Sequence, residues 1–166
     1  PSLGTDDVGK LTGFTDAFAK MCREHDVLTS DRWIKTAEAF VEGKAPQEGF
    51  GYSQFGKMWD LPHRPDGLIV YPNSCSVGVI TGVLEKRVDI PRELKLVLHK
   101  HREIEYLCPI PVTFLYSSTT EVAKALLQQT IRQFRGERIG KVILPFSADP
   151  ESARVPRASA VTGNVR

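Results

Sequence analysis

The stretch that decides the fold runs from Arg64 to Leu115 and reads RPDGLIVYPNSCSVGVITGVLEKRVDIPRELKLVLHKHREIEYLCPIPVTFL. A Pro-Asp-Gly turn leads into a short apolar run, 68–71, which stops at the turn residues 72–74. A helix-like segment follows over 74–86, and a second apolar run, 94–98, ends in a polar loop. Short apolar runs on either side of a segment with helical spacing indicate strand, helix, strand.

Two apolar strands joined by a helix of about a dozen residues require a crossover connection, which favours parallel pairing in a covered sheet. The sequence therefore predicts an α/β fold, a three-layer sandwich in which helices flank a mostly parallel sheet. Ligands of such sheets bind outside the carboxyl ends of the strands. The residues at that edge are 73–76 after the first strand and 99–102 after the second, and we expect the functional site there.

Hydrophobic spacing predicts further elements on both sides of this stretch. We expect helices at 6–24, 47–61 and 118–135 and strands at 32–37 and 141–145. The second of these helices is weakened by Gly49, Gly51 and Gly56, because glycine disfavours helix interiors. From Ser147 to Arg166, Ala, Ser, Pro, Arg and Gly predominate without periodicity, so we expect a disordered tail.

Composition limits the class of protein. Lys and Arg number 22 against 20 Asp and Glu, a net charge of +2, which is not the footprint of a nucleic-acid-binding domain. No apolar segment is long enough to span a membrane, and the first ten residues lack the apolar core of a signal peptide. Three cysteines at unhelpful spacings favour reduced thiols in the cytoplasm over a disulfide framework.

Enzyme motifs are not evident in the sequence. It has no Gly-x-Ser-x-Gly elbow, no Walker lysine and no Cys-x-x-Cys. The glycines of 49–52 resemble a phosphate loop only superficially, because no strand precedes them. His99 and His101 would share a face if their strand persists and could then hold a metal, but a third ligand is missing. The plainer interpretation is polar residues at a strand end, so we predict no metal, no cofactor and no enzymatic activity.

The order of these motifs resembles the C-terminal half of the effector-binding domain of lactose-repressor-type (LacI/GalR) transcription regulators. The motifs are PDGLIVYPN, an apolar helix, V-x-I-P-R-E-L, an apolar strand, and P-x-P-V-T before a helix near Ser118, and the resemblance spans roughly 11–144. It implies one lobe of a periplasmic-binding-protein-like clamshell over residues 1–146, with the helix 118–136 crossing to an N-terminal lobe. That lobe and a helix-turn-helix headpiece for operator DNA are absent from the sequence, so we expect a fragment of a longer regulator.

The resemblance also implies which residues face the effector, a sugar-like or sugar-phosphate-like molecule. Lys10 stands where relatives carry an arginine, and Phe40 could stack on a ligand or serve only in packing. Asn73 stands where relatives present Asn or Asp to the effector; from the residues alone it could equally cap the following helix. Lys100 and His101 replace an aspartate pair. Because Lys donates hydrogen bonds to anions whereas aspartate accepts them from sugar hydroxyls, this change favours an anionic effector or a degenerate site. The alternative is that these are solvated charges that contact no ligand.

A homodimer is implied as well, because operators of this kind are palindromic. The helix 74–86 is apolar on two sides, and we assign the stripe Val77, Ile80 and Leu84 to the sheet. The resemblance then places the dimer contact on the second stripe of this helix and on the loop 104–108. The predicted interface residues are Val79, Val83, Ile104, Tyr106 and Leu107.

The helix near 118–135 carries its own apolar stripe, Ala123, Leu127, Ile131 and Phe134, which we expect to dock on a neighbouring chain or on this lobe. Two other functions stay open. One is a periplasmic or lipoprotein-type solute-binding protein of the same architecture, which a secretion signal upstream would favour. The other is a small flavodoxin-like or nucleotide-binding enzyme, which would need a bound cofactor or measurable activity.

Overall fold

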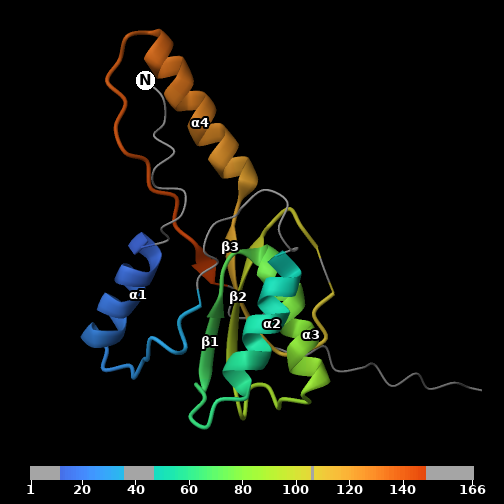
Figure 1. The fold of residues 1–166 in the computed structure, drawn as a ribbon. Coiled ribbons are helices and arrows are strands. Elements are labelled where there is room, and N and C mark those ends of the chain that lie inside the picture. Colours follow the sequence, from blue (N-terminus) through green and yellow to red (C-terminus); the bar gives the residue numbers. More distant parts are fainter. Residues whose placement is uncertain (1–11, 36–46, 106, 149–166) are drawn as a thin grey trace, which may run out of the picture.

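The computed structural model describes residues 12–35, 47–105 and 107–148 (Figure 1). Its elements are α1 (Thr12–Glu24), α2 (Gln47–Trp59), β1 (Gly67–Val70), the 3-10 helix η2 (Asn73–Cys75), α3 (Ser76–Glu85), β2 (Lys95–His101), β3 (Thr113–Ser117), α4 (Thr119–Phe134) and β4 (Ser147–Ala148). All four predicted helices are confirmed within these residues, with ends that differ by a few positions. The first predicted helix began at residue 6, and residues 6–11 lie outside the described part.

The four strands form one sheet in the order β1-β2-β3-β4. β1 and β2 are parallel, with Gly67 opposite Lys95 and Val70 opposite Leu98. β2 and β3 are also parallel, whereas β4 runs antiparallel to β3. The prediction that the two apolar runs of 64–115 pair in the same direction is therefore confirmed, and with it the mostly parallel sheet.

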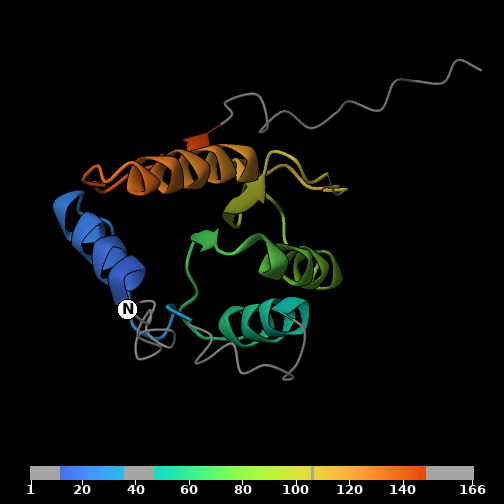
Figure 2. The ribbon, with the colours of Figure 1, turned by 90° about the horizontal axis from the view of Figure 1, so that it is seen from above.

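Helices lie on both sides of this sheet, as a view from above makes plain (Figure 2). α2 and α3 pack together against one face, while α1 lies beside the other. Strand alternation divides the side chains between the two faces. Leu96 and Leu98 of β2 point to the face covered by α2 and α3 and are buried there, whereas His99 belongs to the face beside α1.

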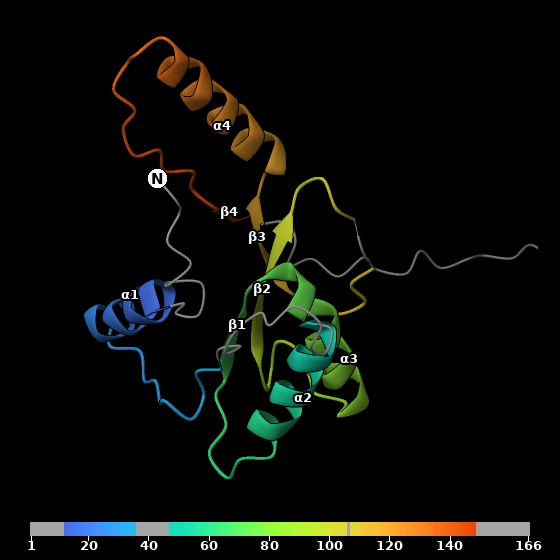
Figure 3. The same cartoon turned by 45° about the horizontal axis from the view of Figure 1, so that its top comes forward.

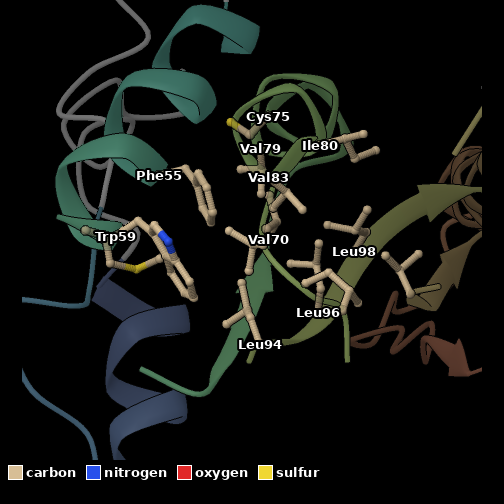
Figure 4. Close-up of a cluster of buried hydrophobic side chains, with 14 residues drawn as sticks. Phe55, Trp59, Val70, Cys75, Val79, Ile80, Val83, Leu94, Leu96 and Leu98 are labelled. Carbon is tan, nitrogen blue, oxygen red and sulfur yellow. The ribbon is translucent and has the colours of Figure 1, made fainter. Parts of the chain in front are cut away.

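One apolar core fills the space between the sheet and the helix pair (Figure 4). Phe55 and Trp59 stack from α2 with ring centroids 5.8 Å apart, and Val83 enters from α3. Leu94 and Leu98 are completely buried beneath them. Burying one such side chain is worth about 1.5–3 kcal/mol, so this cluster stabilises the lobe and fixes the two helices above the strands.

Glycines set how closely α2 and α3 approach each other. A Cβ at Gly78 would overlap the backbone carbonyl oxygen of Glu48 and lie 2.7 Å from the backbone nitrogen of Tyr52. A Cβ at Gly51 would likewise overlap the carbonyl oxygen of Cys75. Gly51, which was predicted to weaken its helix, is thus required by packing, because any side chain there would push α2 away from η2, the short helix that leads into α3.

α4 leaves the sheet at the carboxyl end of β3 and projects away from the rest of the lobe (Figure 3). Ser118 caps the helix, its hydroxyl accepting from the backbone N–H of Glu121 at 3.2 Å, and Gly136 follows its C-terminus at φ 74°. These caps confirm a helix over the predicted range 118–135.

None of the residues of α4 is buried. The expectation that its apolar stripe docks on this lobe is therefore wrong for the single chain, and docking on a neighbouring chain stays a prediction.

Two predicted strands are not formed where they were expected. Residues 31–33 form a turn, in which the N–H of Trp33 donates to the carbonyl of Ser30 at 2.9 Å, and its indole N–H donates to the carbonyl of His63 at 3.0 Å. Residues 34 and 35 have no regular structure, and 36–37 lie outside the described residues. At the other end, 141–145 is irregular and the strand is β4, which begins after Pro145; proline cannot donate to a sheet ladder.

Residues 147 and 148, which were predicted to open a disordered tail, form β4 instead. The remaining residues of the predicted disordered tail, 149–166, lie outside the described part of the chain.

Candidate functional site

β1, β2 and β3 all end at the same edge of the sheet, which we call the carboxyl edge. It is formed by the residues that close or follow these strands, namely 71–76, 99–103 and 117–120. Because the three strands are parallel, backbone groups and side chains from three separate stretches of sequence converge here. This is the edge at which the sequence predicted a site.

Asn73 opens the 3-10 helix that follows β1 and is half-buried. It does not serve as a helix cap, since the residues that precede η2 and α3 are Pro72 and Cys75 and neither helix start has a side-chain capping hydrogen bond. Of the two roles left open by the sequence, capping the next helix is therefore excluded. The side-chain amide of Asn73 therefore lies at the carboxyl edge without a capping role.

Lys100 and His101 belong to β2 rather than to a loop, because the strand continues to His101 and pairs with β3 as far as Ser117. Strand alternation consequently sends the two side chains to opposite faces. The Lys100 ammonium lies 5.3 Å from the ring centroid of Phe114, on the face of the apolar core. His101 turns to the face beside α1, so the two residues do not act as the side-by-side pair that the sequence suggested.

His99 and His101 do share a face, as predicted for a strand that persists. Their ring centroids lie 4.8 Å apart, and the hydroxyl of Ser117 on β3 bridges them. The Ser117 oxygen is 2.8 Å from Nε2 of His99 and 2.9 Å from Nδ1 of His101. His99 is only 4% exposed, and its Nδ1 is buried without a hydrogen-bond partner in the described structure. Burial lowers the pKa of His99, and the neighbouring His101 lowers it further.

Aromatic rings surround the buried imidazole. The ring of Tyr71, which follows β1, lies 4.8 Å from that of His99, and the ring of Phe146, just before β4, lies at 5.4 Å. These side chains line part of an apolar cleft of 610 Å³ between α1 and the sheet. In the described residues no group of three metal-binding side chains comes together, so the histidine pair stands without a third protein ligand.

Glu103 is a residue of the carboxyl edge that sequence reasoning missed. Its carboxylate accepts from the hydroxyl of Ser118 at 2.6 Å and from the backbone N–H groups of Thr119 at 3.1 Å and Thr120 at 3.3 Å. These are unpaired donors of the first turn of α4, where a negative charge is favourable. The Ser118 hydroxyl, with the two backbone donors, holds the pKa of Glu103 well below its usual value. No local pattern announces this contact, because about fifteen residues separate the partners.

Positive charge prevails at the rest of this edge. The guanidinium of Arg102 lies 5.2 Å from the ring centroid of Tyr116 and donates to the hydroxyl of Ser147 in β4. The Lys100 ammonium approaches the same Tyr116 ring at 6.0 Å. With Glu103 engaged by α4, the carboxyl edge offers mainly hydrogen-bond donors. Lys10 and Phe40, the other predicted effector contacts, lie outside the described residues.

The predicted dimer residues Val79 and Val83 are not at the surface. They are 5% and 1% exposed and belong to the core between the sheet and α2. The placement was wrong because α2 of the same chain, rather than a second chain, covers the second stripe of α3. The stripe assigned to the sheet is only partly buried: Ile80 is 6% exposed, whereas Val77 and Leu84 face outward, the latter 48% exposed.

The loop part of the prediction is compatible with a contact. Ile104 and Leu107 are exposed, Leu107 by 89%, whereas Tyr106 lies outside the described residues.

Among the described helices, none is long and apolar enough to cross a membrane.

A family model described as a periplasmic binding protein-like domain matches residues 5–146. The comparison with curated protein sequences gave no match.

Solved structures with a similar fold are described as LacI-family regulators. A regulator from Lactobacillus casei with bound glucose is 19% identical, with a TM-score of 0.59 over 83% of this chain and 48% of its own. The same regulator with bound sucrose is 18% identical, with a TM-score of 0.59 over 83% of this chain and 49% of its own. A regulator from Clostridium acetobutylicum is 19% identical, with a TM-score of 0.60 over 80% of this chain and 49% of its own.

The chain thus spans about half the length of these solved structures. Their similarity supports the predicted fold. Because the family model covers most of the sequence, the chain belongs to the family of periplasmic binding protein-like domains.

Proposed function

We propose that this chain is the effector-sensing and dimerisation part of a LacI/GalR-type transcription regulator. The observation that carries the proposal is the parallel pairing of β1 and β2, which brings Asn73 and the end of β2 to one edge of the sheet. Parallel sheets bind ligands at this edge. The family match and the fold of the neighbouring structures, which are described as LacI-family regulators, support it.

The effector in this proposal is a small sugar-like molecule. The L. casei structures of the same fold are described with bound glucose and sucrose. Asn73 would orient a hydroxyl group, since its amide can both donate and accept. Lys100 and His101 lie on opposite faces, so they would contact different parts of the effector where it extends past the end of β2. Lys10 and Phe40 stay proposed as further contacts.

Signal transmission would follow from the clamshell architecture. An effector held between this lobe and a second one changes the relative orientation of the two lobes, which is coupling through a hinge. In a dimer such a change alters the spacing of two DNA-binding headpieces and thereby the affinity for a palindromic operator. The described residues would take part in effector binding and dimerisation, and operator DNA would be bound by a headpiece outside this chain.

A thermal-shift panel tests effector binding by this chain. Glucose, sucrose and glucose 6-phosphate are added to the wild type, to Asn73→Ala and to the control Ser53→Ala, which removes an exposed hydroxyl from α2. A ligand at a hundred times its Kd stabilises a protein by about 2.7 kcal/mol, so a clear rise in Tm is expected for at least one compound. Asn73→Ala should lose most of that rise and Ser53→Ala should keep it. An equal rise in both variants, or no rise with any compound, contradicts the proposal.

We propose a revised dimer surface, in which the exposed apolar residues of α3 replace the buried ones. It combines Val77 and Leu84 with the loop residues Ile104, Tyr106 and Leu107. Leu84→Glu should produce monomers in sedimentation equilibrium, because a charge in the centre of an apolar interface is not compensated. Leu28→Glu, at an 84% exposed position after α1, is the matched control and should remain dimeric. A dimer that survives Leu84→Glu rules this surface out.

A solute-binding protein for transport is the second candidate, favoured by the description of the matching family model. Its ligand would bind at the same carboxyl edge, so ligand binding does not separate the two functions. The sequence encoded upstream does: a secretion signal supports transport, and a basic helix-turn-helix supports the regulator.

A further inference from the structure

Three side chains at the carboxyl edge form a continuous hydrogen-bonded path from the protein interior outward. It starts at the buried His99, passes through the hydroxyl of Ser117, and ends at the half-buried His101. Of the two ring nitrogens of His101, Nδ1 faces Ser117, and Nε2 makes no hydrogen bond with the described residues. The chemistry that His101 offers to a ligand therefore depends on which nitrogen carries the proton.

The proton positions of this path are limited, since the Ser117 hydroxyl has one hydrogen to donate. If Ser117 donates to His99, then Nδ1 of His99 carries a proton that is buried and has no acceptor. If both imidazoles donate to Ser117, its own hydroxyl proton has no acceptor among the described residues. If His99 donates through Nε2 and Ser117 donates to His101, every proton inside the path has an acceptor, and only a lone pair on His99 is unpaired. Buried donors without acceptors are rare in folded proteins.

We infer that His99 and Ser117 are positioning residues, which fix His101 as the tautomer with its proton on Nε2 and so make it a hydrogen-bond donor to the effector. The inference rests on the proposed function for its ligand, whereas the tautomer itself does not. A carboxylate, such as the aspartate expected at this place in relatives, accepts hydrogen bonds from a sugar hydroxyl. The path through Ser117 instead makes His101 a hydrogen-bond donor.

The remaining groups at this edge agree with a ligand that accepts hydrogen bonds. Lys100 and Arg102 can only donate, and the Glu103 carboxylate is already bound by Ser118 and the first turn of α4. A phosphate or carboxylate group would accept from Nε2 of His101, while Lys100 and Arg102, which lie at the Tyr116 ring on the other face, add positive charge to the same edge. The effector class assigned here is therefore an anionic sugar derivative rather than a neutral sugar.

NMR of the uniformly 15N-labelled chain reads the tautomer directly through long-range correlations between ring protons and ring nitrogens. His101 should show a protonated Nε2 and an unprotonated Nδ1, and His99 the same pattern. Ser117→Ala should abolish the fixed state of His101, Ser117→Thr should restore it, and Thr113→Ala, which alters a residue at the other end of β3, should leave it unchanged. A proton on Nδ1 of either neutral histidine in the wild type overturns the inference, whatever the chain binds.

Ligand chemistry is tested on the same samples with inorganic phosphate and glucose as probes. Phosphate should shift the ring signals of His101 and glucose should not, and Ser117→Ala should weaken the phosphate response at least fivefold while Thr113→Ala keeps it. A response to glucose without one to phosphate overturns the assigned ligand class. Absence of any response to either probe counts against the proposed effector function. The positioning role of Ser117 is then judged only by which nitrogen of His101 carries the proton in the NMR experiment.

Discussion

Replacing Gly78 by alanine tests how α2 and α3 fit together, and Gly49 provides a matched control. Both glycines are the third residue of their helix, Gly78 in α3 and Gly49 in α2. A Cβ at Gly49 has no neighbour within 4 Å, whereas one at Gly78 would overlap the carbonyl oxygen of Glu48. The same substitution therefore adds the same methyl group to two very different surroundings.

The expected free energies have opposite signs. In a helix, alanine is favoured over glycine by about 0.8–1.0 kcal/mol, and Gly49→Ala should gain up to that amount. Overpacking costs about 1–3 kcal/mol. The high end applies to Gly78, because the overlapping atoms belong to the backbone of α2 and cannot turn aside. After subtraction of the helix preference, Gly78→Ala should lower the free energy of unfolding by about 2 kcal/mol.

Urea unfolding, followed by circular dichroism and by the fluorescence of Trp59 in the core, measures both variants. Gly49→Ala should move the midpoint to higher urea and Gly78→Ala to lower urea, with similar slopes. The two free energies should differ by about 3 kcal/mol. Equal stabilisation by both substitutions would show that α2 and α3 do not approach each other as closely as described, and the reasoning would fail.

Three further outcomes follow from the same structure. Glu103→Gln should reduce the helix content of α4 and flatten its acid response, because the lowered pKa of Glu103 provides stability that is lost as pH falls below the usual carboxyl value of 4.5; circular dichroism against pH measures it. His99 is held neutral with a lowered pKa, so wild-type stability should fall as pH drops below 6.5, and His99→Gln should remove much of that slope in unfolding between about pH 5 and 8. Leu98→Ala, at a fully buried position, should cost about 2–5 kcal/mol in urea unfolding, while Ile69→Ala at a 54% exposed one should cost less than about 1 kcal/mol.

Much of the fold could be predicted because its central unit has a strong local pattern. Short apolar runs at 68–71 and 94–98 have few alternatives to strands, and the helix between them forces a crossover. Parallel pairing and the carboxyl edge follow from these facts alone. The Ser-Thr-Thr-Glu of 118–121 and the following Gly136 are equally local signals for helix ends. The predicted range 118–135 of that helix is confirmed.

Other features depend on contacts that a sequence does not reveal. The two apolar stripes of α3 look alike, and only the position of α2 determines that Val83 is buried and Leu84 is not. The contact of Glu103 with α4 joins residues that are far apart in the chain. β3 was not recognised as a strand, because its apolar residues come soon after Pro109 and Pro111 and merge into the helix cap.

The carboxyl edge was correctly located, but its internal arrangement was not predicted. Lys100 and His101 were expected to stand together in a loop, whereas the strand continues and sends them to opposite faces. The bridge through Ser117 arises only from the register of β2 and β3, which places His101 opposite Ser117. A register cannot be inferred from hydrophobic runs of this length alone.

The central claim is that the effector binds where β1 and β2 end. Mapping backbone amide shifts of the chain during titration with glucose 6-phosphate tests it most directly. The largest changes are expected at Asn73 and over 99–102. Changes concentrated at the opposite edge of the sheet, at 65–67 and 94–95, would contradict it.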